Sequence, residues 1–268
     1  MMRRVTLPRS GLGLSRLAFG TSRLHHVGGR ECQSLLSLAA DRGITHFDTA
    51  PAYGDGLAER ELGRFARGRR DRLTIASKYG IPPDPVLAAL PWFGLPWRAL
   101  RSIGRRLGAG ASLPPLTAEG ARASVEASLG RLGTDRLDIL LLHEPHPDRI
   151  ARPDELTSAL EALVVQGKVR QLGLAGGWTG IVATARLMPG LGAVIQAPET
   201  EWTEERVPDL TFGALARGPQ SYFAGGVESR VAADRMRAAL ARRPNGAVIV
   251  STTRAANLEL LAQAAADT

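Results

Sequence analysis

Short apolar runs rich in branched side chains alternate along the chain with longer stretches in which apolar residues recur every three or four positions. A short apolar run bounded by turn residues predicts a buried strand, and the longer periodic stretches predict amphipathic helices. The predicted strands are Arg16–Gly20, Thr45–Asp48, Leu73–Ser77, Leu137–Leu142, Val169–Leu174, Ala193–Ala197, Asp209–Gly213 and Ala247–Val250.

Helical stretches separate these strands, and glycine follows three of them. Gly43, Gly133 and Gly167 stand where a helix commonly ends in the left-handed conformation that glycine adopts without strain. The predicted helices include Arg30–Arg42, Leu57–Ala66, Ala118–Leu132, Asp154–Gln166 and Val231–Arg242.

Eight strands that alternate with helices predict a parallel sheet of the α/β class, and the count of eight favours a closed (β/α)8 TIM barrel. The opening stretch Val5–Leu14 is predicted to form a small hairpin across the barrel floor. Only Pro198–Pro208 separate the sixth and seventh strands, so the sixth helix is expected to be truncated. No linker or repeat interrupts this pattern, and we expect residues 1–268 to form a single domain.

A long excursion over residues 81–116 follows the third strand. Its residues 91–108 combine apolar side chains, Trp92 and Trp97 among them, with arginines. This composition is typical of a helix that lies on a membrane surface, or of an apolar lid over the barrel mouth. We favour the lid, because loops at this end of the strands build barrel active sites, and we expect both tryptophans to contact the substrate.

Composition narrows the range of partners. Apolar residues make up 44% and charged residues 22%, which is typical of a soluble globular protein. No apolar run is long enough to span a bilayer. The first residues, Met1 to Arg4, lead into a turn rather than into the apolar core of a signal peptide, so we expect a cytoplasmic protein.

The net charge of +8 does not by itself indicate a nucleic-acid-binding surface. Of 34 basic residues only Lys78 and Lys168 are lysine, and the arginines are scattered and mostly lie near acidic residues. No aromatic residues are interleaved with a basic stripe, as base stacking would require. The charge favours, at most, the attraction of anionic substrates.

Polar residues gather where three neighbouring predicted strands end. The second strand ends in Asp48 and runs into Tyr53, the third ends beside Lys78, and the apolar fourth strand stops at His143. Because barrel active sites lie at the C-terminal ends of the strands, these four side chains are expected to meet on one rim.

The four residue types make chemical sense together. A buried lysine lowers the pKa of a neighbouring phenol, and an aspartate paired with that lysine offsets the cost of burying its charge. Tyr53 is then expected to exchange a proton with a carbonyl oxygen, which His143 orients by a hydrogen bond. Each residue alone has an ordinary structural reading, as a turn cap, a rim aromatic or a solvated strand end, but their convergence favours catalysis.

These residues stand in motifs that resemble the aldo-keto reductases. The resemblance implies a (β/α)8 barrel that binds NADPH or NADH, a catalytic tetrad of Asp48, Tyr53, Lys78 and His143, and cofactor contacts at Gly20, Thr21 and Asp48. The motifs that carry it are Gly43–Gly54, Glu59, Glu61-Leu62-Gly63, Ser77-Lys78, Ser128–Asp138, Leu142-His143-Glu144-Pro145 and Gly167-Lys168-Val169-Arg170.

The C-terminal third matches the family pattern less closely. Where the family has a serine and an asparagine that hold the nicotinamide carboxamide, this chain has Ala175-Gly176. Gln196 keeps the matching amide, and Phe212 stands where a tyrosine usually stacks on the nicotinamide. The phosphates are expected at the start of the last helix, with NADP favoured over NAD because an arginine stands there. The residues concerned are Ser251, Thr252, Thr253, Arg254 and Asn257.

We therefore expect an NAD(P)H-dependent oxidoreductase that reduces an aldehyde or ketone, or oxidises the alcohol, of a small, partly apolar molecule. The chain stops at Thr268 without the long C-terminal loop of the family it resembles, and we therefore expect an open substrate pocket. Two alternatives remain: a nucleotide-binding barrel with a regulatory or scaffolding role, and a redox-neutral enzyme on the same fold. No metal, nucleic-acid or membrane partner is expected, and the sequence does not predict an oligomeric state.

Overall fold

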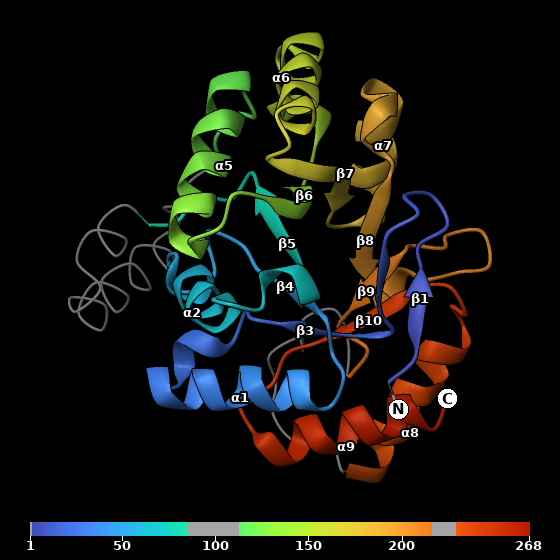
Figure 1. Cartoon of the computed structure of the whole chain (residues 1–268). Coiled ribbons are helices and arrows are strands. Elements are labelled where there is room, and N and C mark those ends of the chain that lie inside the picture. Colours follow the sequence, from blue (N-terminus) through green and yellow to red (C-terminus); the bar gives the residue numbers. More distant parts are fainter. Residues whose placement is uncertain (1, 85–112, 216–228) are drawn as a thin grey trace, which may run out of the picture.

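Eight parallel strands close into a barrel in the computed structural model, which describes residues 2–84, 113–215 and 229–268. Each strand pairs with the next along the chain, and the last strand pairs with the first to complete the ring (Figure 1). The predicted fold class is thereby confirmed. The strands are β3 (Leu17–Gly20), β4 (His46–Asp48), β5 (Thr74–Tyr79), β6 (Leu137–His143), β7 (Val169–Ala175), β8 (Val194–Pro198), β9 (Leu210–Phe212) and β10 (Ala247–Val250).

The predicted N-terminal hairpin is present and covers the floor of the barrel. Its strands, β1 (Arg4–Thr6) and β2 (Gly13–Ser15), pair antiparallel. Leu7 and Leu14 are fully buried in the cluster that fills the barrel interior. The hairpin closes this end of the barrel, so access to the interior is left to the C-terminal ends of the strands.

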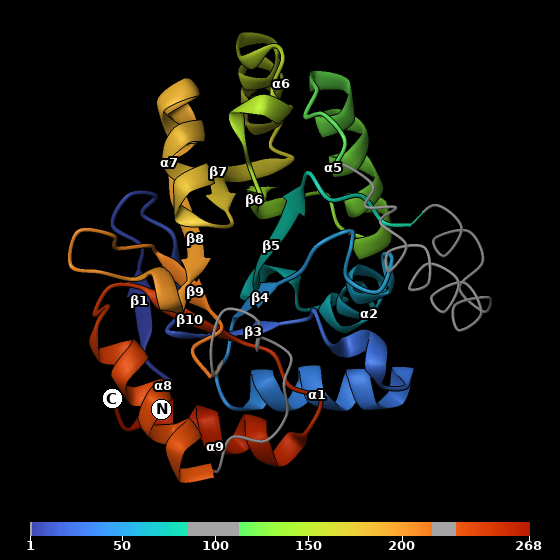
Figure 2. The same ribbon diagram turned by 180° about the vertical axis from the view of Figure 1, so that it is seen from behind.

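Helices surround the barrel on its outside (Figures 1 and 2). The predicted helices Leu57–Ala66 and Ala118–Leu132 agree with the structure at both ends, and the other three agree to within two residues. Gly43, Gly133 and Gly167 all have positive φ, as their predicted capping role requires. The α-helices of the described segments are α1 (Gly29–Asp41), α2 (Leu57–Ala66), α5 (Ala118–Leu132), α6 (Pro153–Val165), α7 (Trp178–Leu187), α8 (Ser229–Ala241) and α9 (Ala255–Ala266).

Short 3-10 turns complete the connections. As predicted, the link between β8 and β9 is too short for a full helix and contains only the turn η6 (Glu199–Glu201). The other 3-10 turns of the described segments are η1 (Leu24–His26), η2 (Arg70–Arg72), η4 (Pro147–Arg149) and η5 (Pro189–Leu191). Within the described parts of the chain, no helix is both long enough and apolar enough to cross a membrane.

The apolar side chains of the strands form two cores, one outside the barrel under the helices and one inside the barrel. Side chains such as Phe19, Phe47 and Ile75 point outward and pack under the helices. Alternate residues such as Ala18, Ala76 and Leu141 point inward and fill the barrel. This alternation decides which residue of each strand projects into the mouth.

Candidate active site

A ring of polar and small residues continues the inward-facing rows of the strands into the barrel mouth. Two residues beyond an inward apolar side chain lie on the same face, so each row ends in a residue that faces the mouth. The ring contains Gly20, Asp48, Lys78, His143, Ala175, Gln196, Phe212 and Ser251. Every member except Ala175 is a residue that the sequence predicted to bind cofactor or to act in catalysis.

Asp48 and Lys78 form a buried ion pair across neighbouring strands. The Lys78 Nζ lies 2.6 Å from Asp48 Oδ1 and donates a second hydrogen bond, of 2.9 Å, to the carbonyl oxygen of Thr49. Burial lowers the pKa of Lys78, but the charges of Asp48 and Tyr53 raise it, and the net pKa lies above its ordinary value. Lys78 is therefore a fixed ammonium group at neutral pH.

A tight turn after β4 brings Tyr53 over this lysine. Asp55 adopts a positive φ between Gly54 and Gly56, which do so as well, and the chain folds back into α2. The Lys78 Nζ lies 5.0 Å from the centroid of the Tyr53 ring. The structure thus brings together the tyrosine and the lysine that the sequence paired.

The net pKa of Tyr53 lies above that of a free phenol, so the predicted lowering is wrong. Burial raises the pKa because it disfavours the phenolate, and this effect exceeds the opposing effect of Lys78, which lowers the pKa. Asp48 raises the pKa further. Tyr53 is consequently protonated at neutral pH, the state that a proton donor needs.

His143 completes the group at the end of β6. Its ring stands at 87° to that of Tyr53, with 6.2 Å between the centroids. Burial, followed by the charges of Lys78 and Arg149, lowers the pKa of His143 to about 3. The imidazole is therefore neutral at pH 7, and its Nδ1 is buried with no hydrogen-bond partner among the residues that the structure describes.

Gln196 offers a buried amide for a planar polar ligand. The side chain is 2% exposed, and within the described residues its Oε1 has no hydrogen-bond partner. An unsatisfied buried oxygen is costly unless a ligand or water supplies a donor. The carboxamide of a nicotinamide supplies such a donor, so Gln196 fits the expected cofactor.

The positions next to Gln196 depart from the family pattern. Ala175 brings no polar group, and Gly176 has φ of +152°, which favours glycine. A Cβ on Gly176 would lie 2.7 Å from Oε2 of Glu144, whose own φ is +48°. The Glu144 carboxylate therefore fills the space next to Gly176.

The start of α9 suits a phosphate group. Arg254 is the N-cap residue, and no side chain of the described residues caps the helix there. Arg254 and Asn257 are exposed, Ser251 and Thr253 are partly exposed, and the Thr252 Oγ1 accepts a 3.1 Å hydrogen bond from the Arg254 backbone N–H. The free N–H groups and the positive end of the helix dipole favour an anion.

Two of the residues expected to contact the cofactor also stabilise the structure of the barrel. A Cβ on Gly20 would lie 2.4 Å from the Ser251 Oγ, so glycine permits the close approach of these segments. Thr21 is fully buried, and its hydroxyl donates to the carbonyl oxygen of Asp48 at 3.1 Å and accepts from the Thr49 hydroxyl, with 2.9 Å between the two oxygens. Phe212 is partly buried and packs against the inner core at the mouth. Trp92, Trp97 and most of the excursion over 81–116 lie outside the described residues.

The sequence analysis did not identify the residues that stabilise the strand ends on which the site is built. Ser77 donates to Glu59, a fully buried carboxylate that also receives Arg131 from α5, at 2.7 and 2.5 Å. Arg149 bonds to backbone carbonyls at the ends of β5 and β6. The spacing of Glu59 from Leu62 and Ala66, three and seven residues further along α2, is the signal that could have shown its burial, whereas nothing distinguished Arg149 among the many arginines.

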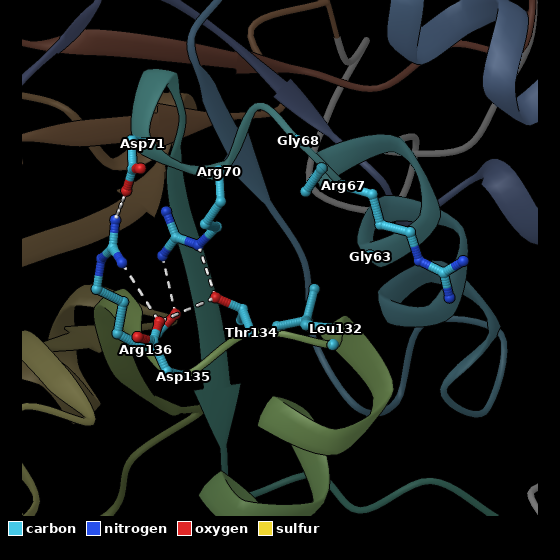
Figure 3. Close-up of a pocket in the computed structure, with 11 residues that line it drawn as sticks. Gly63, Arg67, Gly68, Arg70, Asp71, Leu132, Thr134, Asp135 and Arg136 are labelled. Atoms are coloured by element: carbon cyan, nitrogen blue, oxygen red, sulfur yellow. Dashed lines mark hydrogen bonds and ion pairs between the residues drawn. The ribbon is translucent and has the colours of Figure 1, made fainter.

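A hollow of about 410 Å³ lies at the opposite end of the barrel, between the C-terminal ends of α2 and α5. Figure 3 shows contacts among its lining side chains: Arg136 pairs with Asp71 and Asp135, and Arg70 donates a hydrogen bond to the Thr134 hydroxyl. These residues precede β5 and β6, whereas Lys78 and His143 lie near the other ends of the same strands. The hollow is therefore separate from the candidate active site.

Comparison with known proteins agrees with this geometry. A model of the aldo/keto reductase family matches residues 16–210. The chain is 33% identical over 179 residues to the 6-dehydroglucose reductase of Agrobacterium fabrum, covering 65% of this chain and 53% of that protein. It is 31% identical over 179 residues to the D-threo-aldose 1-dehydrogenase of a Pseudomonas species, covering 62% and 51%. The chain spans about half the length of the curated relatives it matches.

Solved structures show the same barrel over nearly the whole chain. A putative aldo-keto reductase from Pseudomonas aeruginosa has a TM-score of 0.68 at 26% identity, covering 97% of this chain and 94% of that one. The holo form of an aldo-keto reductase from Bacillus halodurans has a TM-score of 0.69 at 20% identity, covering 98% and 91%, and shows the shared fold. With its family model matched over most of its length, the chain belongs to the aldo/keto reductase family.

Proposed function

We propose that this protein is an NAD(P)H-dependent oxidoreductase that reduces an aldehyde or ketone, or oxidises the corresponding alcohol, of a small molecule. The observation that carries the proposal is the buried Asp48–Lys78 pair beside Tyr53 and a neutral His143 at the barrel mouth. A polar cluster of this kind is costly to bury, and it supplies the positioned proton donor that general acid catalysis at a carbonyl needs.

Each of the four side chains has its own role in the reaction at the carbonyl oxygen. When bound, the nicotinamide cofactor supplies or accepts the hydride. Tyr53 donates its phenolic proton to the oxygen as negative charge develops there. Lys78 stabilises the phenolate that Tyr53 becomes, and Asp48 holds Lys78 in place. His143, being neutral, donates a hydrogen bond to the same oxygen and orients the substrate.

Other residues of the mouth would hold the cofactor. The unpaired Gln196 Oε1 would accept from the carboxamide, and Phe212 would lie against the nicotinamide ring. The N–H groups at the start of α9 would receive phosphate, with Ser251, Thr252, Thr253 and Asn257 close by. Arg254 at this helix start favours NADPH over NADH.

The names of the relatives direct the choice of substrates. One is a 6-dehydroglucose reductase and another a D-threo-aldose 1-dehydrogenase. We therefore place sugars and their carbonyl derivatives first in a panel that also contains apolar aldehydes, ketones and keto acids.

The test is the variant Tyr53→Phe, assayed for NADPH and NADH oxidation across that panel. Loss of a general acid is expected to lower kcat by about 10²–10⁴-fold, while cofactor affinity, measured by fluorescence quenching, stays near that of wild type. Tyr79→Phe is the matched control, because the Tyr79 hydroxyl bonds to the Thr117 backbone outside the tetrad. A Tyr53→Phe enzyme that keeps most of its kcat would show that another group donates the proton.

The Ala175-Gly176 pair favours a second candidate, a barrel that binds the dinucleotide in a regulatory role. The family's serine and asparagine are absent there, and Glu144 lies against Gly176 instead. Tight binding of NADPH without turnover on any substrate of the panel would favour this candidate over the oxidoreductase.

A further inference from the structure

Arg149, the last residue of η4, donates hydrogen bonds to backbone carbonyl oxygens of three separate segments. Its Nη1 lies 3.2 Å from the His143 oxygen and 2.8 Å from the Glu144 oxygen, both at the end of β6. Its Nη2 bonds to the Gly80 oxygen just after β5. Nε and Nη2 reach the Pro114 oxygen, at 3.1 and 3.0 Å.

The backbone at these carbonyls is closely packed. Gly80 has φ of +136°, and a Cβ there would lie 2.6 Å from the His143 carbonyl oxygen. Glu144, the next residue after His143, has the positive φ already noted. A positive φ at a residue other than glycine, as at Glu144, persists only where surrounding contacts hold it, and the hydrogen bond from Arg149 to the Glu144 carbonyl oxygen is one such contact.

The guanidinium is well suited to this task. It carries five N–H donors in one rigid plane and can serve several acceptors at once, whereas the lysine ammonium is a compact charge on a flexible stem. The reverse contact, from the Leu116 N–H to the Arg149 carbonyl oxygen at 2.7 Å, fixes the backbone of Arg149 itself. The side chain is therefore held between the strand ends that carry Lys78 and His143.

We propose that Arg149 is a positioning residue for the reaction, holding the backbone of His143 against the end of β5 so that the imidazole stands at a fixed place relative to Tyr53 and Lys78. The proposal rests on the proposed function and adds a residue that touches neither substrate nor cofactor.

The positive charge of Arg149 also affects His143 directly. It lowers the pKa of His143, although less than burial and the charge of Lys78 do. The charged and titratable groups around His143 are Lys78 on β5, Tyr53 above it and Arg149 on η4. Burial lowers the pKa of Arg149 itself, against smaller opposing effects of Tyr79 and Glu144. Removing the Arg149 charge is thus expected to raise the pKa of His143, and replacing it with another cation is not.

Two substitutions separate the shape of the side chain from its charge. Arg149→Met removes every donor and the charge but keeps an unbranched apolar side chain, and Arg149→Lys keeps the charge without the planar fork. Arg152→Met is the matched control, because Arg152 lies three residues further on, is exposed and pairs only with Glu155 among the described residues. Each full-length variant is compared with wild type for kcat, for NADPH affinity and for the pH titration of His143 by NMR.

Both Arg149 variants should lose kcat by about tenfold to a hundredfold, as small displacements of reacting groups do, with NADPH affinity unchanged. The His143 pKa should rise in Arg149→Met and stay near about 3 in Arg149→Lys. Arg152→Met should match wild type in all three measurements. If Arg149→Met does not fold, the lysine variant alone decides through its kcat.

Wild-type kcat in Arg149→Lys would overturn the proposal, because a cation without the fork would then suffice. Wild-type kcat together with an unchanged His143 pKa in Arg149→Met would overturn it as well. The titration needs neither substrate nor cofactor, so it tests Arg149 even if the panel yields no activity. An inactive wild type would count against the proposed function alone.

Discussion

The Glu144 carboxylate occupies the space that a side chain at residue 176 would enter. Its Oε2 lies 2.7 Å from the position of a Cβ on Gly176, and the backbone there is in a region that favours glycine. A side chain at residue 176 would therefore require Glu144 to move and would adopt a backbone conformation that favours glycine.

Gly176→Ala is expected to destabilise the protein by roughly 1–3 kcal/mol, from backbone strain and the contact with Glu144. Gly177→Ala is the matched control, because Gly177 has an ordinary φ of −65° and its nearest contact would be an unstrained 3.8 Å. The measurement is the free energy of unfolding in urea. Equal effects of the two substitutions would contradict the close approach seen at Gly176.

Lys78→Arg is expected to lower kcat by about a hundredfold or more, although it keeps the positive charge. A planar guanidinium is too large for the space in which the Lys78 ammonium contacts Asp48, Thr49 and the Tyr53 ring. The same substitution at Lys168, which pairs with Glu126 near the surface, should leave kcat unchanged. Near-normal turnover in Lys78→Arg would reduce Lys78 to a general positive charge.

Stability should fall in mild acid because of His46. Burial lowers the pKa of His46 to about 4 in the folded protein, against 6.5 as its ordinary value, and this effect outweighs the charges of Asp48 and Asp138, which raise the pKa. Between these values the unfolded chain binds a proton that the folded protein does not, so stability is lost as the pH falls from about 6.5 to about 4.

This loss should amount to roughly 1–3 kcal/mol between pH 7 and pH 4.5, and should shrink in His46→Gln. His146→Gln is the control, since His146 is exposed. Urea unfolding at both pH values measures the difference. An unchanged pH dependence in His46→Gln would assign the acid sensitivity to other groups.

Arg254→Gln is expected to weaken NADPH binding by about tenfold or more and to leave NADH binding unchanged, because a charge-assisted contact to the 2′-phosphate is lost. Arg186→Gln, on the exposed face of α7, removes the same charge elsewhere and should change neither affinity. Titration of both cofactors by fluorescence quenching decides the point. Parallel losses for NADPH and NADH would place Arg254 at a phosphate that the two cofactors share, or simply at the helix cap.

The pattern of the sequence determined the barrel and most of its mouth. Alternation of inward and outward side chains is a local property of a strand, so the residues at strand ends are readable from the chain alone. Lys78 and His143 were predicted at the mouth because predicted apolar strands end beside them, and the capping glycines Gly43 and Gly133 marked where helices end. Each of these predictions depends only on residues close together along the chain.

The tertiary structure decided what depends on burial and on contacts between distant segments. The direction of the Tyr53 pKa is set by how far the phenol is removed from water, and no spacing of residues reports that. Glu144, at the end of another strand, occupies the space that a side chain at residue 176 would enter. The Arg149 side chain is held by carbonyl oxygens from three segments. Backbone carbonyls are identical at every position, so only the folded chain distinguishes the arginine that binds them from its many neighbours.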